Sequence, residues 1–394
     1  MEKLILELQT RLGEEGLKLQ EPMKEHTTFR VGGPADLFIM PKDAEELKDA
    51  LEILRKSDTP VMVIGNGSNL LVRDKGIRGA VIQIYNRMAD IMVEGDIIEA
   101  KGGALLSAVA AKAADASLTG LEFASGIPGS IGGAVVMNAG AYGGEMKDVL
   151  VSVDVLTKEL EVKTIPAEEL DLSYRHSIVP EEGYIVLGAK LKLTKGKEAA
   201  IRGRMAELAE QRREKQPLQY PSAGSTFKRP TGYFAGKLVQ DAGLKGKTIG
   251  GAQISEKHSG FLINIGGATA QDILDLIAFC QKEVKDQFGV TLETEVKIVG
   301  EELRKEEEEA KEQKAFRKQA IKEEKARKKA AKEAKKLSKD AEKAKKEENK
   351  EKAKVAEEVK AEDAKTTEEV KETSEESKIE EVKEEVKTEE GGDK

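Results

Sequence analysis

The sequence predicts an α+β protein with two folded domains and a highly charged C-terminal tail. Three observations lead to this prediction. Helical and strand-like segments alternate through most of the chain, two segments are dominated by glycine, and the composition changes abruptly near residue 300. Mixed segments of this kind pack as sheets covered by helices around an apolar core.

The first part of the chain is expected to contain two helices and two strands. Residues 1–20 place leucines on one helical face, and 27–34 suit a strand followed by a turn. Residues 42–57 predict a second helix, for which Asp43 is a suitable N-cap. A buried strand at 61–64 then runs directly into a glycine-rich loop, which completes an α/β unit.

Short strands and longer helices are expected to alternate along the rest of the body. Further helices are predicted at 104–117, 197–215, 233–242 and 271–288. Further strands are predicted at 80–85, 91–93, 97–100, 149–156, 160–165, 184–193, 248–254, 260–265 and 295–299.

These elements suggest two domains and a tail. Residues 1–195 form the first region, with two α/β subdomains and a core at 26–195, and residues 196–300 form the second domain. Residues 301–394 contain 28 basic and 31 acidic residues and almost no large apolar ones. Such a composition cannot bury enough apolar surface to fold, so the tail is predicted to be helical in part and then disordered.

The charge of the tail is unevenly distributed. Residues 311–350 carry 17 basic and 8 acidic residues, whereas 351–394 carry 9 basic and 17 acidic ones. The tail is therefore either a solubilising appendage or a tether to an anionic surface or another protein.

Composition also limits the kind of protein this chain can be. The body has 37 basic and 42 acidic residues, so nucleic acid is not an expected ligand. Cys280 is the only cysteine, which rules out an intrachain disulfide and suits a reducing compartment. Because the N-terminus resembles no signal peptide and no apolar stretch could span a bilayer, we expect a cytoplasmic protein. We also expect a monomer.

Glycine and small polar residues dominate the loop at 65–69 and the segment at 121–144. Glycines allow successive backbone N–H groups to converge on an anion such as a pyrophosphate. A single segment of this kind is ordinarily a tight turn, but two of them favour a phosphate-bearing cofactor. The Rossmann fingerprint does not fit, because Leu70 occupies the position of its third glycine.

Two further segments carry candidate reactive groups. In the loop around Ser225, Gly224 permits a sharp turn and Lys228 adds a positive charge. Arg175 has a planar fork suited to a carboxylate, although a structural salt bridge is the alternative explanation. Glu295 stands near the end of the folded region and is either a reactive acid or a surface acid.

Together these segments resemble the MurB family, the UDP-N-acetylenolpyruvoylglucosamine reductases. The resemblance covers roughly residues 20–300 and rests on 27–35, both glycine segments, 174–177, the Ser225 loop and 292–297. It implies an FAD-binding domain of the MurB and vanillyl-alcohol-oxidase type, followed by a smaller α+β substrate domain. It also implies FAD-dependent reduction of UDP-N-acetylglucosamine enolpyruvate by NADPH to UDP-N-acetylmuramate.

The resemblance also implies roles for individual residues. Ser225 would be the proton donor, while Arg175 and Glu295 would stabilise the enol intermediate. A protonated Glu295 could donate a hydrogen bond to that anion. The residues expected to bind substrate are Tyr174, Gly224 and Lys228. The residues expected to bind FAD without a covalent bond are Arg30, Gly65, Asn66, Gly67, Ser68, Asn69, Gly126, Ile127, Pro128, Gly129, Ser130, Gly132, Gly133, Asn138 and Tyr142.

Other interpretations of the sequence stay open. The short separation of Arg175 and Ser225 resembles the MurB variant that lacks a substrate-capping loop. His26, His176 and His258 show no metal-ligand spacing, so no metal is expected, and His176 either orients Arg175 or has a structural role. The chain could instead be another FAD-dependent oxidase or dehydrogenase of the same fold, or a scaffold acting through its tail.

Overall fold

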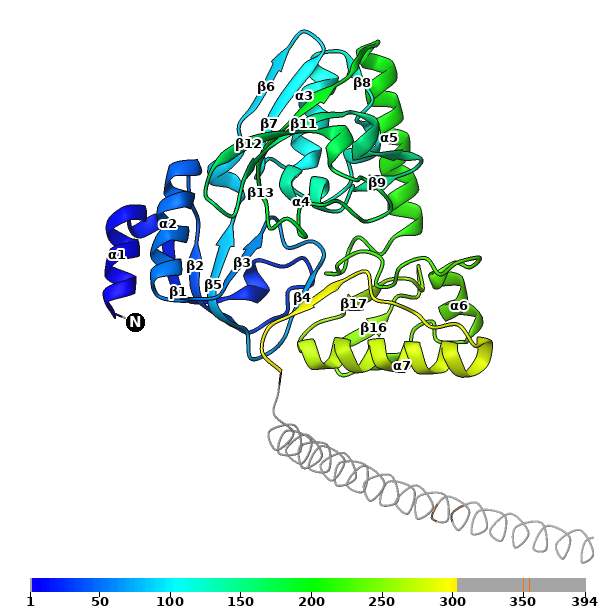
Figure 1. Ribbon diagram of the computed structural model, residues 1–394. Coiled ribbons are helices and arrows are strands. Elements are labelled where there is room, and N and C mark those ends of the chain that lie inside the picture. Colours follow the sequence, from blue (N-terminus) through cyan, green and yellow to red (C-terminus); the bar gives the residue numbers. More distant parts are fainter. Residues whose placement is uncertain (1, 303–349, 351–353, 355–394) are drawn as a thin grey trace, which may run out of the picture. The chain divides into compact units, whose positions relative to one another are not determined.

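The computed structural model describes residues 2–302 together with 350 and 354 (Figure 1). Residues 1–303 form one compact unit, so the predicted division near residue 195 stays a prediction. The expected helix and disorder of the tail lie outside the described residues. In the described part of the chain, no helix is long and apolar enough to cross a membrane.

The first sheet has four strands in the order β1-β2-β5-β3. Its strands are β1 (Leu17–Pro22), β2 (Pro34–Ile39), β3 (Val61–Ile64) and β5 (Ile77–Gln83). β1 is antiparallel to β2, whereas β5 pairs in parallel with β2 and β3. α1 (Glu2–Leu12) and α2 (Ala44–Lys56) lie beside one another at this sheet, and their leucines share its core (Figure 1).

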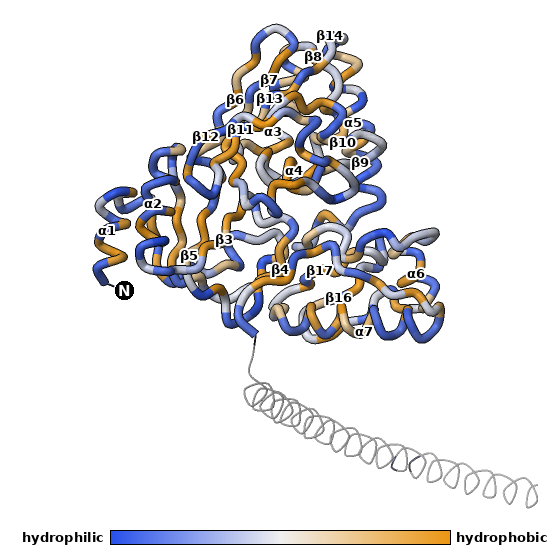
Figure 2. Tube along the Cα trace, viewed as in Figure 1, coloured by the Kyte–Doolittle hydropathy of each residue, from blue (hydrophilic) through white to orange (hydrophobic). Residues whose placement is uncertain are grey.

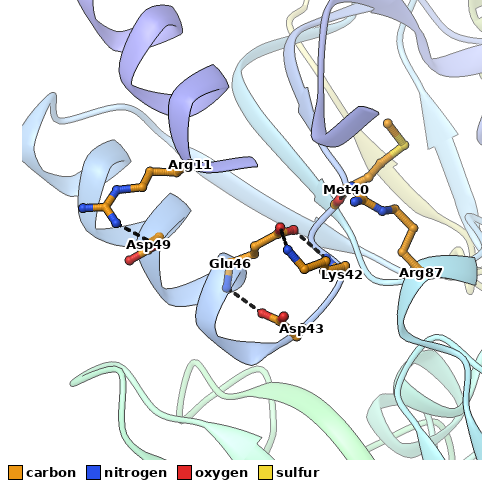
Figure 3. A network of polar contacts seen from close by, with 7 residues as sticks. All are labelled: Arg11, Met40, Lys42, Asp43, Glu46, Asp49 and Arg87. Carbon is orange, nitrogen blue, oxygen red and sulfur yellow. Dashed lines mark hydrogen bonds and ion pairs between the residues drawn. The ribbon is translucent and has the colours of Figure 1, made fainter. Parts of the chain in front are cut away.

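α2 begins as the sequence predicts. Asp43 caps the helix by accepting the N–H of Glu46 at 2.8 Å (Figure 3). Glu46 in turn accepts the backbone N–H of Lys42 at 2.9 Å and pairs with its ammonium group. Arg11 of α1 pairs with Asp49 of α2 at 3.7 Å, which adds an exposed contact between the two helices.

The second sheet has five antiparallel strands in the order β12-β11-β13-β7-β6. Its members are β6 (Ile91–Glu94), β7 (Ile97–Lys101), β11 (Leu150–Leu156), β12 (Val162–Pro166) and β13 (Ile185–Lys192). Associated helices are α3 (Leu106–Asp115), α4 (Ile131–Val136) and α5 (Glu198–Lys215). The largest apolar core includes Ile98, Leu106 and Leu191 from these elements, and Figure 2 shows apolar residues along the strands.

The third sheet is small, and one long helix contributes several of the buried residues in its core. β15 (Thr248–Ile249), β16 (Ala252–Ile254) and β17 (Leu262–Asn264) pack with α6 (Ala235–Asp241) and α7 (Ala270–Phe288). The last strand of the described residues, β18 (Lys297–Val299), returns to pair in parallel with β4 (Leu70–Val72) (Figure 1). This pairing brings the end of the body against the strand that follows the first glycine loop.

Shorter elements complete the described chain. Two-residue strands pair as β8 (Leu118–Thr119) with β14 (Thr194–Lys195), and as β9 (Gly140–Ala141) with β10 (Gly144–Glu145). Single 3-10 turns occur at Glu14–Gly16, Met23–Glu25, Asn86–Met88, Glu122–Ala124, Met146–Asp148 and Ala167–Glu169.

Two predictions near the N-terminus were wrong. The helix expected at 1–20 ends at Leu12, because Gly13 adopts a φ of +69° and the chain then enters β1. The strand expected at 27–34 is irregular, because the Thr27 hydroxyl donates to the carbonyl of Val31 and Arg30 has a φ of +54°. The strand here is instead β2, whose continuous apolar run is buried.

Candidate active site

A tight turn presents Tyr174 and Arg175 at its tip. The backbones of Ser173 and His176 exchange hydrogen bonds of 3.3 and 3.2 Å, which closes the turn. The Arg175 guanidinium donates from Nε to Oε1 of Glu295 at 2.7 Å and lies 5.1 Å from the ring centre of Tyr174. Two residues 120 positions apart, each singled out by the sequence, therefore meet.

Glu295 is fixed through its backbone, which leaves its carboxylate for Arg175. Its N–H donates to the carbonyl of Thr226 at 2.8 Å, and its own carbonyl accepts the side-chain amide of Asn69 at 3.1 Å. The Glu295 side chain is only 12% exposed. The Tyr174 hydroxyl also lies 3.5 Å from Oε2, so one carboxylate contacts both residues at the tip of the turn.

Ser225 immediately precedes Thr226, the residue whose carbonyl accepts the N–H of Glu295. The next residue, Thr226, is fully buried, and its hydroxyl accepts the N–H of Leu262 at 3.2 Å. Ser225 itself is exposed, and Gly224 before it has a φ of +75°. The hydroxyl is thus presented to solvent from an anchored segment, one residue from the carbonyl that binds Glu295.

The two glycine segments lie against one another. The side-chain amide of Asn66 donates to the carbonyl of Pro128 at 2.7 Å. A Cβ on Gly65 would lie 2.2 Å from Oγ of Ser130, so a larger residue would force that hydroxyl to move. Gly67 has a φ of +61°, and a Cβ there would lie 1.9 Å from the carbonyl oxygen of His26.

This junction offers a set of unused hydrogen-bond donors. The backbone N–H groups of residues 66–69, and those of Gly129 and Ser130, have no acceptor among the described residues. Gly67, Gly129 and Ser130 are nevertheless buried, and buried donors are ordinarily paired. Converging, unpaired N–H groups fit the phosphate oxygens of a cofactor such as FAD.

Arg212 is a site residue that sequence reasoning missed. It extends from α5, is 9% exposed, and donates from Nη1 to the carbonyl of Gly126 at 2.7 Å. Its guanidinium also lies 5.4 Å from the ring centre of Tyr142. Burial lowers the pKa of this guanidinium from its ordinary value. Its basic neighbour Arg213 obscures Arg212 in the sequence, since only the fold shows which cation points inward.

Other predicted residues have partners within the protein. Asn138 is 1% exposed and bonds only to protein groups among the described residues, so its direct contact with a cofactor stays a prediction. Lys228 pairs with Glu293 at 3.2 Å. His176 pairs with Asp171 at 3.1 Å, so it is given a structural contact instead of one to the guanidinium beside it.

The remaining predicted residues lie at the edges of the two loops. Arg30 and Gly133 are exposed, Tyr142 is 37% exposed, and Ile127 donates its N–H to the carbonyl of Ala124 at 3.0 Å. The N–H of Gly132 is bonded to Gly102 at 2.7 Å. Among residues 2–302, 350 and 354, no group of His, Cys, Asp and Glu side chains could hold a metal ion.

Comparison with known proteins identifies a cofactor-binding part and a reductase-specific part of the chain. Residues 35–165 match an FAD binding domain, and residues 216–299 match the C-terminal domain of UDP-N-acetylenolpyruvoylglucosamine reductase.

Relatives match over nearly their whole length. The UDP-N-acetylenolpyruvoylglucosamine reductase of Agathobacter rectalis is 59% identical over 303 residues, which cover 74% of this chain and 96% of the relative. That of Alkaliphilus metalliredigens is 54% identical and covered to 99%. The crystal structure of MurB from Thermus caldophilus superposes with a TM-score of 0.62 at 38% identity, covering 72% of this chain and 98% of that one. The chain therefore belongs to the UDP-N-acetylenolpyruvoylglucosamine reductase family.

Proposed function

We propose that the chain is an FAD-dependent reductase that uses NADPH to convert UDP-N-acetylenolpyruvoylglucosamine to UDP-N-acetylmuramate. The observation that supports this most directly is the 2.7 Å pair of Arg175 and Glu295, with the backbone of Glu295 bonded to the residue that follows Ser225. Asn69 joins that pair to the first glycine loop, so the reacting groups lie next to a phosphate-binding backbone. The reaction supplies a precursor of peptidoglycan.

The cofactor would be held at the junction of the two glycine segments. The N–H groups of residues 66–69 and of Gly129 and Ser130 would bind its pyrophosphate, and Arg212 would add a nearby positive charge. Bound FAD supplies the hydride, which no side chain can provide. The protein's own residues then have to bind the carboxylate, stabilise negative charge and deliver a proton.

Arg175, Glu295 and Ser225 divide these tasks. The guanidinium of Arg175 uses only Nε for Glu295, so its two terminal nitrogens can hold the substrate carboxylate in a bidentate contact. Glu295 orients that guanidinium, and in its protonated form it would donate a hydrogen bond to the anion that develops in the enol. Hydride adds to one carbon of the enol ether double bond, and Ser225 gives its hydroxyl proton to the other carbon of that bond.

Substrate would bind across the exposed rim of this site. Tyr174 is 56% exposed beside Arg175, and Gly224 leaves open space before Ser225. The exposed ion pair of Lys228 with Glu293 contributes little to the free energy of unfolding. Lys228 can therefore leave the Glu293 carboxylate and bind the diphosphate of the substrate. These three residues therefore suit the UDP-sugar.

The test is spectroscopic. Purified protein should be yellow, should bleach with NADPH under anaerobic conditions, and should regain colour when the enolpyruvyl sugar is added. Bleaching without recovery would favour another oxidase or dehydrogenase of this fold. Colourless protein that binds no added FAD would favour a scaffold acting through the tail.

Replacing Gly67 by Ala should sharply reduce FAD content. Left-handed backbone alone costs an L-residue about 1–2 kcal/mol, and the Cβ would also lie 1.9 Å from the carbonyl oxygen of His26. Flavin absorbance per protein and the melting temperature measure the effect. Gly95→Ala is the matched control, since its φ of +64° is similar and its Cβ would meet nothing within 4 Å. If both variants lost FAD equally, the contact between the new Cβ and the carbonyl oxygen of His26 would not be the cause of the loss.

Deleting residues 303–394 should leave FAD content and turnover nearly unchanged. The cut is placed after Glu302 because Glu301 donates its N–H to the carbonyl of Gly76 at 2.8 Å and Glu302 pairs with Arg73 at 2.7 Å. We further propose that the enzyme is a cytoplasmic monomer and that the basic part of the tail binds anionic surfaces. Full-length and truncated protein should then differ in vesicle binding at low salt and converge at high salt. Loss of FAD on truncation would place the tail within the fold.

A further inference from the structure

The turn that carries Arg175 is tied to the end of α4 on both sides. On one side, the side-chain amide of Asn138 donates to the carbonyl of Ser173 at 3.1 Å. On the other, the hydroxyl of Ser177 donates to the carbonyl of Val136 at 2.9 Å. Asn138 and Val136 both lie within the second glycine segment, so this segment and the turn share two anchors.

Asn138 is saturated by contacts within the protein. Its amide also donates to Oε2 of Glu145 at 2.7 Å, and its Oδ1 accepts the N–H of Lys147 at 3.0 Å. The two N–H groups and the carbonyl oxygen of the Asn138 side chain all make hydrogen bonds, and Asn138 is 1% exposed. Buried amides with all partners in place are rigid, and losing one partner leaves a desolvated polar group unpaired.

Ser177 is the second anchor and is equally inaccessible. It is 2% exposed, and its hydroxyl has a single partner, the carbonyl of Val136, among the described residues. The bond fixes the chain two residues after Arg175.

Arg175 has reason to need such anchoring. Its φ of +56° lies in the left-handed region, which an arginine adopts at a cost and keeps only where the surroundings impose it. The ion pair with Glu295 fixes the guanidinium but not the backbone. The hydrogen bonds of Asn138 and Ser177 therefore hold the strained backbone at the tip of the turn.

We propose that Asn138 and Ser177 are positioning residues for the reduction step, which act by holding the turn that aims Arg175 at the substrate carboxylate. This inference rests on the role given above to Arg175. It assigns to Asn138 a function through Arg175 in place of direct contact with FAD. The second glycine segment and the reacting arginine then form one rigid unit.

The test uses Ser177→Ala in full-length protein with bound FAD. Substrate reduction, followed by return of flavin colour, should slow about tenfold, since small misplacements of catalytic groups have large effects. Flavin reduction by NADPH and affinity for FAD should stay within a factor of two, roughly. Thr157→Val is the matched control, because Thr157 is also buried, and its hydroxyl accepts the N–H groups of Glu159 and Glu161 in a remote hairpin. It should lower only the melting temperature.

Asn138→Asp provides the second variant. The carboxylate retains an acceptor for the N–H of Lys147 but has no donor for Ser173 and repels Glu145. We expect substrate reduction to slow on the order of 100-fold with FAD affinity unchanged. A selective loss of FAD affinity would overturn the inference and return Asn138 to the cofactor site.

A double-mutant cycle separates positioning from general stability. In an Arg175→Ala background, Ser177→Ala should slow substrate reduction no further, because the residue through which it acts is gone. Full additivity would overturn the inference. If Arg175→Ala alone left substrate reduction intact, the proposed role of Arg175 would fail, which is an outcome distinct from an inactive Arg175→Ala with a fully active Ser177→Ala.

Discussion

Ser225→Ala should abolish most substrate reduction while leaving flavin reduction by NADPH intact. Delivery of hydride to the cofactor requires no proton from Ser225, whereas protonation of the substrate carbon does. Loss of a general acid ordinarily slows a step ~10²–10⁴-fold. Because Thr226 is buried and hydrogen-bonded through Leu262 and Gly260, the loop should keep its shape when one exposed hydroxyl is removed. Stopped-flow measurement of the two half-reactions distinguishes the steps.

Ser222→Ala is a suitable control in the same segment, since it removes a hydroxyl of the same kind three residues earlier. It should leave both half-reactions near the rates of the unchanged protein. If Ser225→Ala slowed both half-reactions equally, Ser225 would be removed from the role of acid.

Arg175→Lys should be nearly as damaging as Arg175→Ala. A lysine can replace the charge but not the fork, which must reach Glu295 with one nitrogen and the substrate carboxylate with two. Both variants should lower kcat for substrate reduction on the order of 10²-fold or more, with FAD content unchanged. The Ala variant also leaves the Glu295 carboxylate without Arg175, and its melting temperature shows how much stability that loss costs.

Arg213→Lys on α5 is the matched control for that change of side chain. The Arg213 side chain is exposed and pairs only with Glu210 among the described residues, and the Lys variant keeps the backbone carbonyl that accepts the ammonium of Lys257, so the replacement should be silent. Retention of most activity in Arg175→Lys would show that charge alone is needed at the turn, and would remove the bidentate contact from the mechanism.

The regular parts of the fold were predictable because local pattern and tertiary packing agree there. The Asp43 cap and the leucines of α2 are one example, and the long amphipathic α7 is another. β2 was missed because its buried run, which ends at Ile39, does not alternate and so lacks the period of a half-exposed strand. Gly13, which ends α1, was overlooked because the apolar spacing continues past it to Leu17.

The site was predictable only through resemblance. Nothing local indicates that Arg175 should meet Glu295, since the contact is made by long-range strand pairing. Arg212 illustrates the opposite limit. It sits in a run of exposed charges, and its burial follows from the way α5 packs beside Gly126. Polar side chains that organise a site from within, such as Asn138, carry no sequence pattern that separates them from ligand contacts.

The return of β18 to β4 sets the order in which the enzyme can mature. Asn69 and Glu295 are 226 residues apart in the chain, and closing a loop of that length costs about 5 kcal/mol of entropy. Contacts of such high sequence separation slow folding. A chain whose synthesis stops before residue 295 therefore has its glycine loops and its arginine turn but no carboxylate to complete them. The catalytic site is complete only when β18 pairs with β4. A polypeptide that ends before Glu295 would therefore bind cofactor without reducing substrate.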